Sequence, residues 1–524
     1  MRLVLTAIAV SACVEATPTE STAVDDLSSP PAARVCTTGE IRCDAFVRTT
    51  ASGAIHADLA PTGLSPADLK SAYSIPTPTG TPTIAIVDAY GYANVESDLA
   101  TYRAQYGLGP CTRANGCLTV LNQNGATSPL PAAPPATDDW TIETALDVQM
   151  ASAVCPTCKI LLVQSNKNDA QLYTAIDAAA AQGPAVISNS WGAAENTTNT
   201  AHEPDMNHPG IAIFVSAGDH GYNEGNTAAH YPSVSAHAIS VGGTRLARDA
   251  TSPRGWHEVA WSLNANNVGG GSSCSTLIPK PAYQVDVPCA FKAATDISAV
   301  GDPATGVAVY NAANGGWMVL GGTSAAAPIV ASIVAVIGHG ADASGPWIAQ
   351  HTSVLYDVTQ GTNGNCGSVI CNAGIGWDGP TGYGTPNATL LAKGAAPELT
   401  ITSPAAGAHV DPDFEITVDA VDAVSVRYVL DNSATVTLTD PPFTASVTDA
   451  APGPHVISIT ATAVTGSTQH DTLQVIVDAE MTGSGSGGTM MNPAEPSGGC
   501  SAAGGGSLWT GLALALALVR RRRT

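Results

Sequence analysis

The stretch Gly321-Gly-Thr-Ser-Ala-Ala-Ala-Pro328 stands directly before an apolar run, residues 329–337, and decides the fold. Its small residues allow a tight turn and place Ser324 at the start of a helix, and Pro328 suits the first helical turn, where its missing N–H is not needed. A hydroxyl at a helix N-terminus lies beside free backbone N–H groups, which stabilise the anion formed when it attacks a carbonyl. Taken alone, the stretch more often marks an N-capping hydroxyl before a buried helix.

Several short, continuous apolar runs precede this stretch, and each is typical of a strand buried on both faces of a parallel sheet. Helical patterns lie between them, at about residues 140–153 and 169–182. Alternating strands and helices predict a doubly wound, mostly parallel α/β sheet over residues 63–395, with chemistry at the carboxyl ends of its strands. The predicted strands are residues 83–87, 159–163, 185–188 and 211–215.

The composition excludes one class of partner and indicates a compartment. The chain has 524 residues and a formal net charge of −23, which argues against nucleic acid as a partner. Ten of its twelve cysteines form close sequential pairs, which predict disulfides in an exported protein. A redox or zinc half-site is the alternative for the third of these pairs. The pairs are Cys36 with Cys43, Cys111 with Cys117, Cys155 with Cys158, Cys274 with Cys289, and Cys366 with Cys371.

The two ends of the chain carry predicted targeting segments. Residues 1–13 form a secretory signal that ends like the lipobox of bacterial lipoproteins at Cys13; an ordinary signal-peptidase site is the alternative. The apolar run at residues 508–519, followed by Arg520–Arg523, is shorter than the roughly 20 residues of a membrane span. With Cys500 before it, this tail resembles the C-terminal sorting tails of myxobacterial surface proteins; a marginal membrane helix is the alternative. Both ends predict an exported protein, secreted or anchored at the bacterial cell surface.

The remaining segments complete the predicted domain organisation. Residues 14–62 form an N-terminal extension, rich in Ser, Thr, Pro and Ala at its start and partly disordered. Residues 396–478 carry short alternating runs between closely spaced turns, which predict a small immunoglobulin-like β-sandwich. Residues 479–506 are rich in Gly, Ser, Met and Pro and form a flexible linker before the tail at residues 507–524.

Two carboxylates lie four residues apart at Glu143 and Asp147, a spacing that puts both on one face of a helix. Forced together, they share protons and one pKa rises, so the pair can act as a general base at acidic pH. A surface acidic pair is the alternative. Asp219 follows a predicted buried strand, at the sheet edge where sites form; a turn-forming Asp beside Gly is the alternative.

Taken together and in this order, these stretches resemble the sedolisin family of serine-carboxyl peptidases, which has a subtilisin-like fold. The family pattern Glu-x-x-x-Asp, Ser-x-Gly-Asp and Ser-Gly-Thr-Ser-x-x-x-Pro falls on Glu143, Asp147, Asp219 and Ser324, over roughly residues 65–395. The resemblance implies an endopeptidase that cuts proteins or peptides through a Ser324 acyl-enzyme. Glu143 is then the general base, Asp147 orients it, and Asp219 is a protonated acid that donates a hydrogen bond to the oxyanion.

The same resemblance implies one structural Ca²⁺ ion near the C-terminal end of the domain. The matching ligands are two carboxylates and three backbone carbonyls, from Asp357, Val358, Gly374, Gly376 and Asp378. These are hard oxygen ligands, and glycine lets the backbone turn its carbonyls inward. A Gly-rich turn with capping Asp residues is the alternative.

The chain matches a further family position and departs from the pattern in two places. Trp191 resembles a family position near the site. Gly321 stands where the family usually has Ser. The predicted domain start near Gly63 leaves too little sequence before it for the family's long folded propeptide, which puts self-inhibition by a propeptide and acid-triggered maturation in doubt.

Two other functions stay open. A subtilisin-type Ser-His-Asp peptidase would use Asp88, but its His is expected in a His-Gly-Thr-like turn on a helix, and none of the twelve His residues sits in one. A catalytically inactive, surface-anchored protein would keep the fold and bind through the β-sandwich. The complete set of four catalytic residues argues against this second alternative.

Overall fold

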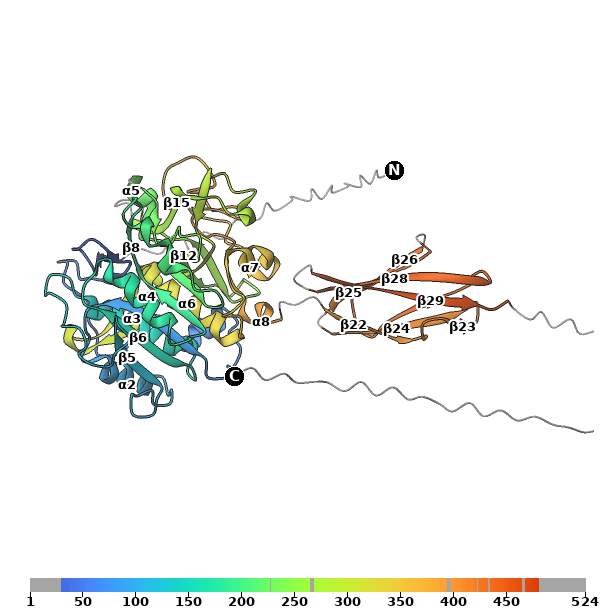
Figure 1. The fold of residues 1–524 in the computed structure, drawn as a ribbon, viewed down its shortest axis with the longest axis horizontal. Coiled ribbons are helices and arrows are strands. Elements are labelled where there is room, and N and C mark those ends of the chain that lie inside the picture. Colours follow the sequence, from blue (N-terminus) through green and yellow to red (C-terminus); the bar gives the residue numbers. More distant parts are fainter. Residues whose placement is uncertain are drawn as a thin grey trace, which may run out of the picture.

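The computed structural model describes residues 30–479, apart from residues 227, 264–267, 394–396, 422, 432–433 and 464–466. Figure 1 shows an α/β part, coloured blue to yellow, and an all-β part, coloured orange to red. The predicted signal, the linker beyond residue 479 and the C-terminal tail lie outside the described residues, together with Cys13 and Cys500. No helix among the described residues is long and apolar enough to cross a membrane.

A sheet of eight strands forms the centre of the α/β part, in the order β13-β12-β9-β7-β4-β6-β5, with β17 also beside β12. Its strands pair in parallel, except that β13 runs antiparallel to β12. The predicted doubly wound, mostly parallel sheet is confirmed. Its strands are β4 (Thr83–Ala89), β5 (Leu118–Asn122), β6 (Lys159–Ser165), β7 (Val186–Asn189), β9 (Ala212–Ser216), β12 (Ala238–Arg248), β13 (Trp256–Ala260) and β17 (Ile297–Val300).

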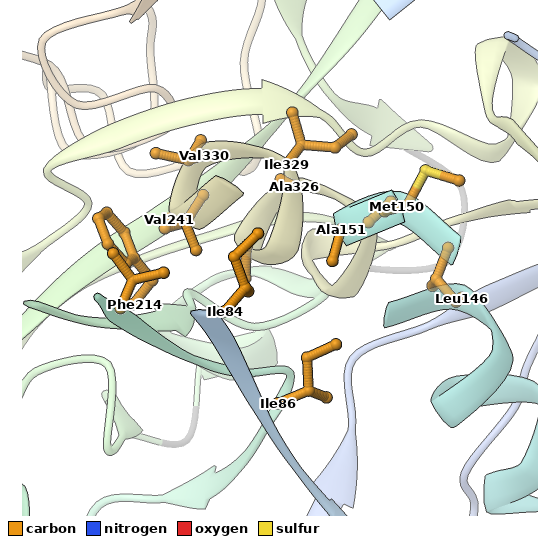
Figure 2. Close-up of a cluster of buried hydrophobic side chains, with 14 of the residues drawn as sticks. Ile84, Ile86, Leu146, Met150, Ala151, Phe214, Val241, Ala326, Ile329 and Val330 are labelled. Carbon is orange, nitrogen blue, oxygen red and sulfur yellow. The ribbon is translucent and has the colours of Figure 1, made fainter. Parts of the chain in front are cut away.

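Two long helices, α3 (Trp140–Val154) and α6 (Thr323–Ile337), pack against each other beside this sheet. Figure 2 shows apolar side chains of both helices meeting those of the strands in one buried cluster. Every residue of α6 up to Val336 is buried. A helix that is apolar all round must be enclosed on all sides, so the first turn of α6, with Ser324, lies inside the domain.

Residues 30–62 are built into the α/β part. β1 (Ala32–Arg34) and β3 (Phe46–Arg48) extend a sheet in the order β1-β3-β19-β18, and β2 (Arg42–Cys43) pairs with β8 (Trp191–Ala194). Several side chains of this segment belong to the main hydrophobic core: Val35, Cys36, Ile41, Cys43, Ala45 and Val47. Residues 30–62 of the predicted N-terminal extension are therefore part of the α/β fold, ahead of the predicted domain start near Gly63. Strands of two or three residues are too short to show the alternation from which a strand is predicted.

Shorter elements complete the α/β part. The helices are α1 (Pro66–Ala72), α2 (Val95–Gln105), α4 (Gln171–Ala180), α5 (Asn223–Asn226), α7 (Gly345–Gln350) and α8 (Ala388–Leu391), with 3₁₀ turns η1 (Thr200–Met206), η2 (Ala282–Gln284), η3 (Pro303–Thr305), η4 (Ala312–Asn314) and η5 (Thr352–Val354). The strands are β10 (His220–Tyr222), β11 (His230–Tyr231), β14 (Ser262–Leu263), β15 (Val268–Pro279), β16 (Phe291–Ala294), β18 (Val307–Asn311), β19 (Gly316–Gly321), β20 (Leu355–Tyr356) and β21 (Thr385–Pro386).

The all-β part consists of two sheets, ordered β22-β24-β27 and β23-β29-β28-β25-β26, around a hydrophobic core of its own. This architecture agrees with the predicted β-sandwich. The strands are β22 (Glu398–Ser403), β23 (Ala408–Val410), β24 (Phe414–Val421), β25 (Ala423–Leu430), β26 (Ala434–Leu438), β27 (Phe443–Val447), β28 (Gly453–Ala463) and β29 (Thr468–Val477).

Five disulfides tie the α/β part together, and all five predicted pairs are confirmed. Cys155 and Cys158 are bonded to each other at the end of α3, so they do not form the alternative zinc half-site. The Cys36–Cys43 bond lies within the N-terminal segment that passes between β8 and β19.

Candidate active site

Ser324 is the second residue of α6, and Gly322 before the helix fixes its position. Gly322 has a φ of 100°, in the left-handed region that favours glycine. Pro328 is the sixth residue of the helix and does not lie in the first turn, where it was predicted. Proline has no N–H to donate to the carbonyl four residues before it, which is that of Ser324. The Ser190 hydroxyl lies 3.3 Å from this carbonyl oxygen.

Glu143 and Asp147 lie one turn apart on α3 and are fully buried, which excludes the surface acidic pair. The Ser190 hydroxyl donates to Oδ1 of Asp147 at 2.8 Å. The Ser324 hydroxyl lies close enough to lower the pKa of Glu143, yet its nearest acceptor here is the Ser190 carbonyl, at 3.1 Å. Neither Glu143 oxygen has a hydrogen-bond partner among the described residues. Rotation of the Ser324 side chain would therefore turn its hydroxyl from the Ser190 carbonyl to Glu143 and form a hydrogen bond there.

Three carboxyl groups interact in this part of the site. Burial raises the pKa of Glu143 well above its usual range, and the charges of Asp147 and Asp88 add to the effect. Burial also raises the pKa of Asp147, and Asp88 adds to it, against the hydrogen bond from Ser190. Burial raises the pKa of Asp88 to about 7. The three groups therefore share protons, and their titrations are coupled. The first of them to lose its proton becomes a buried, poorly solvated carboxylate, which takes a proton back readily and so acts as a base.

Asp219 comes shortly after β9 and is fully buried. Its Oδ1 accepts from the backbone N–H and the hydroxyl of Thr323, at 2.7 and 2.9 Å. Its Oδ2 has no hydrogen-bond partner among the described residues. Burial is the main cause that raises the pKa of Asp219 well above its usual range; the charge of Asp44 adds to it, and Arg34 and Thr323 oppose it. A raised pKa favours the protonated form of Asp219, and Oδ2 is the oxygen left free to carry the proton.

The group that faces Ser324 comes from the N-terminal segment. The backbone N–H of Ser324 donates to the carbonyl oxygen of Asp44 at 2.9 Å. A Cβ on Gly322 would lie 2.1 Å from that oxygen and 2.7 Å from Oδ2 of Asp219, so both oxygens border the space that glycine leaves. A peptide carbonyl thus lies between the nucleophile and the oxyanion donor predicted from the sequence.

The Cys36–Cys43 disulfide of the same segment lies against Glu143. Its two sulfur atoms and a carboxylate oxygen of Glu143 all lie within 4.8 Å of one another. Both sulfur atoms are engaged in the disulfide, so the group is not a set of metal ligands. The segment shields Glu143 from water and contributes to the burial that raises its pKa.

Three residues beyond the predicted four shape the site. Asp44 was missed, and Asp88 was considered only for the alternative triad. Asp88 lies at the carboxyl end of β4, so the predicted sheet was the signal that could have placed it near the site. Trp191, named by the resemblance, begins β8, and its indole N–H donates to the Val87 carbonyl at 2.8 Å, which anchors β8 beside β4.

The five predicted calcium ligands lie in neighbouring loops. Asp357 Oδ2 accepts from the N–H of Gly376, and Asp378 Oδ2 from the N–H of Gly374, both at 2.9 Å. Val358 is joined to the same turn through Thr381, whose hydroxyl lies 3.5 Å from the Val358 carbonyl. The pKa of Asp378 is raised to about 7, mainly by burial and also by the charge of Asp357, against hydrogen bonds from Gly374 and Thr381. A divalent cation between these two carboxylates would relieve that repulsion, so the donor set fits Ca²⁺.

Comparison with known proteins agrees with this geometry. The model of the subtilase family matches residues 132–366. Kumamolisin of Bacillus sp. (strain MN-32) is 30% identical over 376 residues, which are 66% of this chain and 66% of that protein. Sedolisin of Pseudomonas sp. (strain 101) is 31% identical over 199 residues, 34% of this chain and 33% of that protein.

A solved structure shows the same relationship. Pseudomonas sedolisin, described as a serine-carboxyl proteinase, superposes with a TM-score of 0.55 at 25% identity and covers 64% of this chain and 98% of its own. The chain thus spans 66% of the curated kumamolisin sequence and a third of the curated sedolisin sequence. The subtilase-family domain and these relatives together support a serine-carboxyl peptidase of the sedolisin family.

Proposed function

We propose that the chain is an exported serine-carboxyl endopeptidase that hydrolyses peptide bonds in proteins at acidic pH. The observation that carries the proposal is the Asp44 carbonyl oxygen, which accepts from the Ser324 N–H beside the unpartnered Oδ2 of Asp219. Two donors that converge on one carbonyl oxygen form an oxyanion site. Glu143, the proposed general base, lies close enough to the Ser324 hydroxyl for that hydroxyl to lower its pKa.

The residues would divide acyl transfer between them. Ser324 Oγ attacks the carbonyl carbon while Glu143 takes the hydroxyl proton, and Asp219 and the Ser324 N–H stabilise the oxyanion. Glu143 then protonates the leaving amine as the C–N bond breaks. A water molecule repeats the sequence on the acyl-enzyme and releases the new carboxyl group. Asp147, held by Ser190, and Asp88 position the shared proton near Glu143.

Covalent labelling tests the proposal directly. A fluorophosphonate probe should modify Ser324 in the wild-type chain and leave Ser324→Ala unlabelled, with the site read by peptide mass mapping. Pseudo-iodotyrostatin, the compound bound in the sedolisin structure, should protect Ser324 from the probe. Absence of both labelling and casein hydrolysis between pH 3 and pH 8 would leave the inactive binding protein as the better account.

A Ser-His-Asp triad is not favoured by the contacts of the described residues. The Ser324 hydroxyl lowers the pKa of Glu143, which is a carboxyl and not a histidine. The pKa of Asp88 is shifted by burial and by the Thr144 hydroxyl, and no histidine among the described residues is a main cause of the pKa shifts of Asp88, Glu143 or Asp147. Export is supported by the five disulfides, which persist in oxidising compartments. Anchoring at the cell surface rests on terminal residues outside the described range.

We also propose one structural Ca²⁺ held by Asp357, Val358, Gly374, Gly376 and Asp378. A ligand that binds only the folded chain adds about 2.7 kcal/mol at a hundredfold excess over its dissociation constant. Chelation should therefore lower the melting temperature of the wild-type chain by several degrees, and Asp378→Asn should be less stable and insensitive to chelator. The matched control Asp342→Asn, at an exposed aspartate, should keep the wild-type response. Unchanged melting after chelation, with no metal in elemental analysis, would contradict the site.

A further inference from the structure

The N-terminal segment crosses the catalytic site in extended form. Before Asp44, β2 pairs antiparallel with β8, with Arg42 opposite Gly192 and Cys43 opposite Trp191. At Asp44 itself, the backbone N–H donates to the Ser190 carbonyl at 3.1 Å. Beyond Asp44, β3 pairs antiparallel with β19. The segment is therefore bound by main-chain hydrogen bonds on both sides of Ser324, as a peptide added to a sheet edge is.

The Asp44 side chain enters a small polar subsite. Its Oδ2 accepts from the Ser216 hydroxyl at 2.6 Å and from Nε2 of His230 at 2.8 Å. Its Oδ1 lies 3.6 Å from the guanidinium of Arg34, which belongs to the same segment. Asp44, Ser216 and His230 are all buried. A buried carboxylate needs such partners, and hydrogen bonds to a charged group are stronger than neutral ones.

Gly192 makes room for the imidazole of this subsite. A Cβ on Gly192 would lie 2.2 Å from Nε2 of His230, so any other residue at that position would push into the imidazole. Ser216 ends β9, and His230 begins β11. Both donors thus belong to the body of the domain and stay in place when the segment is replaced by another peptide.

We infer that Ser216 and His230 form a specificity subsite for an aspartate side chain on the acyl side of the cut bond, and that the Asp44–Ala45 bond of this chain is its first substrate. The inference rests on the proposed function. The reaction is ordinary hydrolysis: Ser324 Oγ bonds to the Asp44 carbonyl carbon, the Ala45 nitrogen leaves with the proton from Glu143, and water then frees the Asp44 carboxylate. Until that cut, the segment fills the site, which excludes other substrates.

The position of the Cys36–Cys43 disulfide allows the N-terminal piece to leave after the Asp44–Ala45 bond is cut. Both cysteines lie before the Asp44–Ala45 bond, and among the described residues no disulfide joins them to the rest of the chain. After hydrolysis the covering piece is held only by hydrogen bonds and packing, and it can leave. Glu143 would then be uncovered.

The first test is self-processing in the full chain. Wild type should acquire a new N-terminus at Ala45, seen by intact mass and N-terminal sequencing, and Ser324→Ala should keep the bond intact. Asp44→Asn should slow the cut at least tenfold, because the amide loses the charge that both donors recognise. Asp58→Asn makes the same isosteric change farther along the segment and should process at the wild-type rate.

The second test uses peptides and does not depend on how Asp44 variants fold. Quenched peptides carrying residues 40–48, with Ser in place of Cys43, are compared with matched peptides that have Asn or Leu in place of Asp44. Processed wild type should prefer the Asp peptide in kcat/KM by tenfold or more, and Ser216→Ala should narrow that preference.

The outcomes separate the two proposals. Equal rates on the three peptides, or a wild-type cut elsewhere in the segment, would overturn the aspartate subsite while casein hydrolysis still supported a peptidase. No labelling at Ser324 and no hydrolysis of any substrate would overturn the proposed function itself.

Discussion

Ser324→Ala and Glu143→Gln should each lower kcat/KM on a peptide substrate by about 10⁴-fold or more. The double variant should have a kcat/KM no lower than that of the less active single variant. Groups that act as one unit are not additive, because either alone has nothing to work with. The Ser324 hydroxyl needs a base beside it, and Glu143 is the carboxyl whose pKa it influences. The measurement is steady-state hydrolysis by all three variants and wild type, carrying the same N-terminus.

Stability provides the control for Glu143→Gln. The folded chain raises the pKa of Glu143, so at neutral pH the unfolded chain loses a proton that the folded chain retains. The glutamate therefore stabilises the folded chain less as pH rises above its unfolded pKa of about 4.3. Glu143→Gln removes this penalty, so its melting temperature should exceed that of wild type at pH 7 and match it near pH 4. Near-normal hydrolysis by either single variant would refute the assignment of the pair.

The candidate site residues could be found from the sequence because each lies in a stretch whose structure is determined locally. β4 and β9 are buried on both faces, so they are continuous apolar runs, and Asp219 follows one of them directly. The four-residue spacing of Glu143 and Asp147 fixes their common face on α3 without reference to the rest of the chain.

The segment that fills the site could not be predicted in this way. β2 has two residues and β3 has three, so neither shows a period, and their stability comes from pairing with distant β8 and β19. Asp44 has no local feature that distinguishes it from other acidic residues; its partners Ser216 and His230 are brought to it only by the fold. The start of the domain was placed too late for the same reason.

Asp219→Asn should change how activity depends on pH at the alkaline end. The oxyanion needs a donor at Oδ2, and an ionised carboxylate would repel it instead. The folded chain raises the pKa of Asp219, so the proton is present below that pKa and is lost as pH rises through it. Wild-type activity should therefore fall on the alkaline side as Asp219 ionises.

The acid side depends on different groups. Glu143 accepts a proton only when the cluster with Asp147 and Asp88 carries a negative charge, so activity should fall as the cluster becomes fully protonated. The acid limb therefore reports the coupled titration of the three carboxyl groups and not the pKa of one residue. The opposite demands of the cluster and Asp219 give a bell-shaped profile.

Replacing Asp219 by Asn distinguishes the acid limb of the pH profile from the alkaline limb, because the Asn amide donates a hydrogen bond at every pH. Asp219→Asn should flatten the alkaline limb or move it by more than one pH unit, and leave the acid limb in place. Its maximal rate should fall by up to about 10²–10³-fold, the usual effect of a weakened oxyanion donor. The measurement is kcat/KM against pH on one short peptide, with folding checked by circular dichroism at each pH, and Asp342→Asn as the control at an exposed aspartate. If the alkaline limb of Asp219→Asn coincides with that of wild type, Asp219 is not the oxyanion acid; an optimum well above neutrality would return a Ser-His-Asp mechanism to consideration.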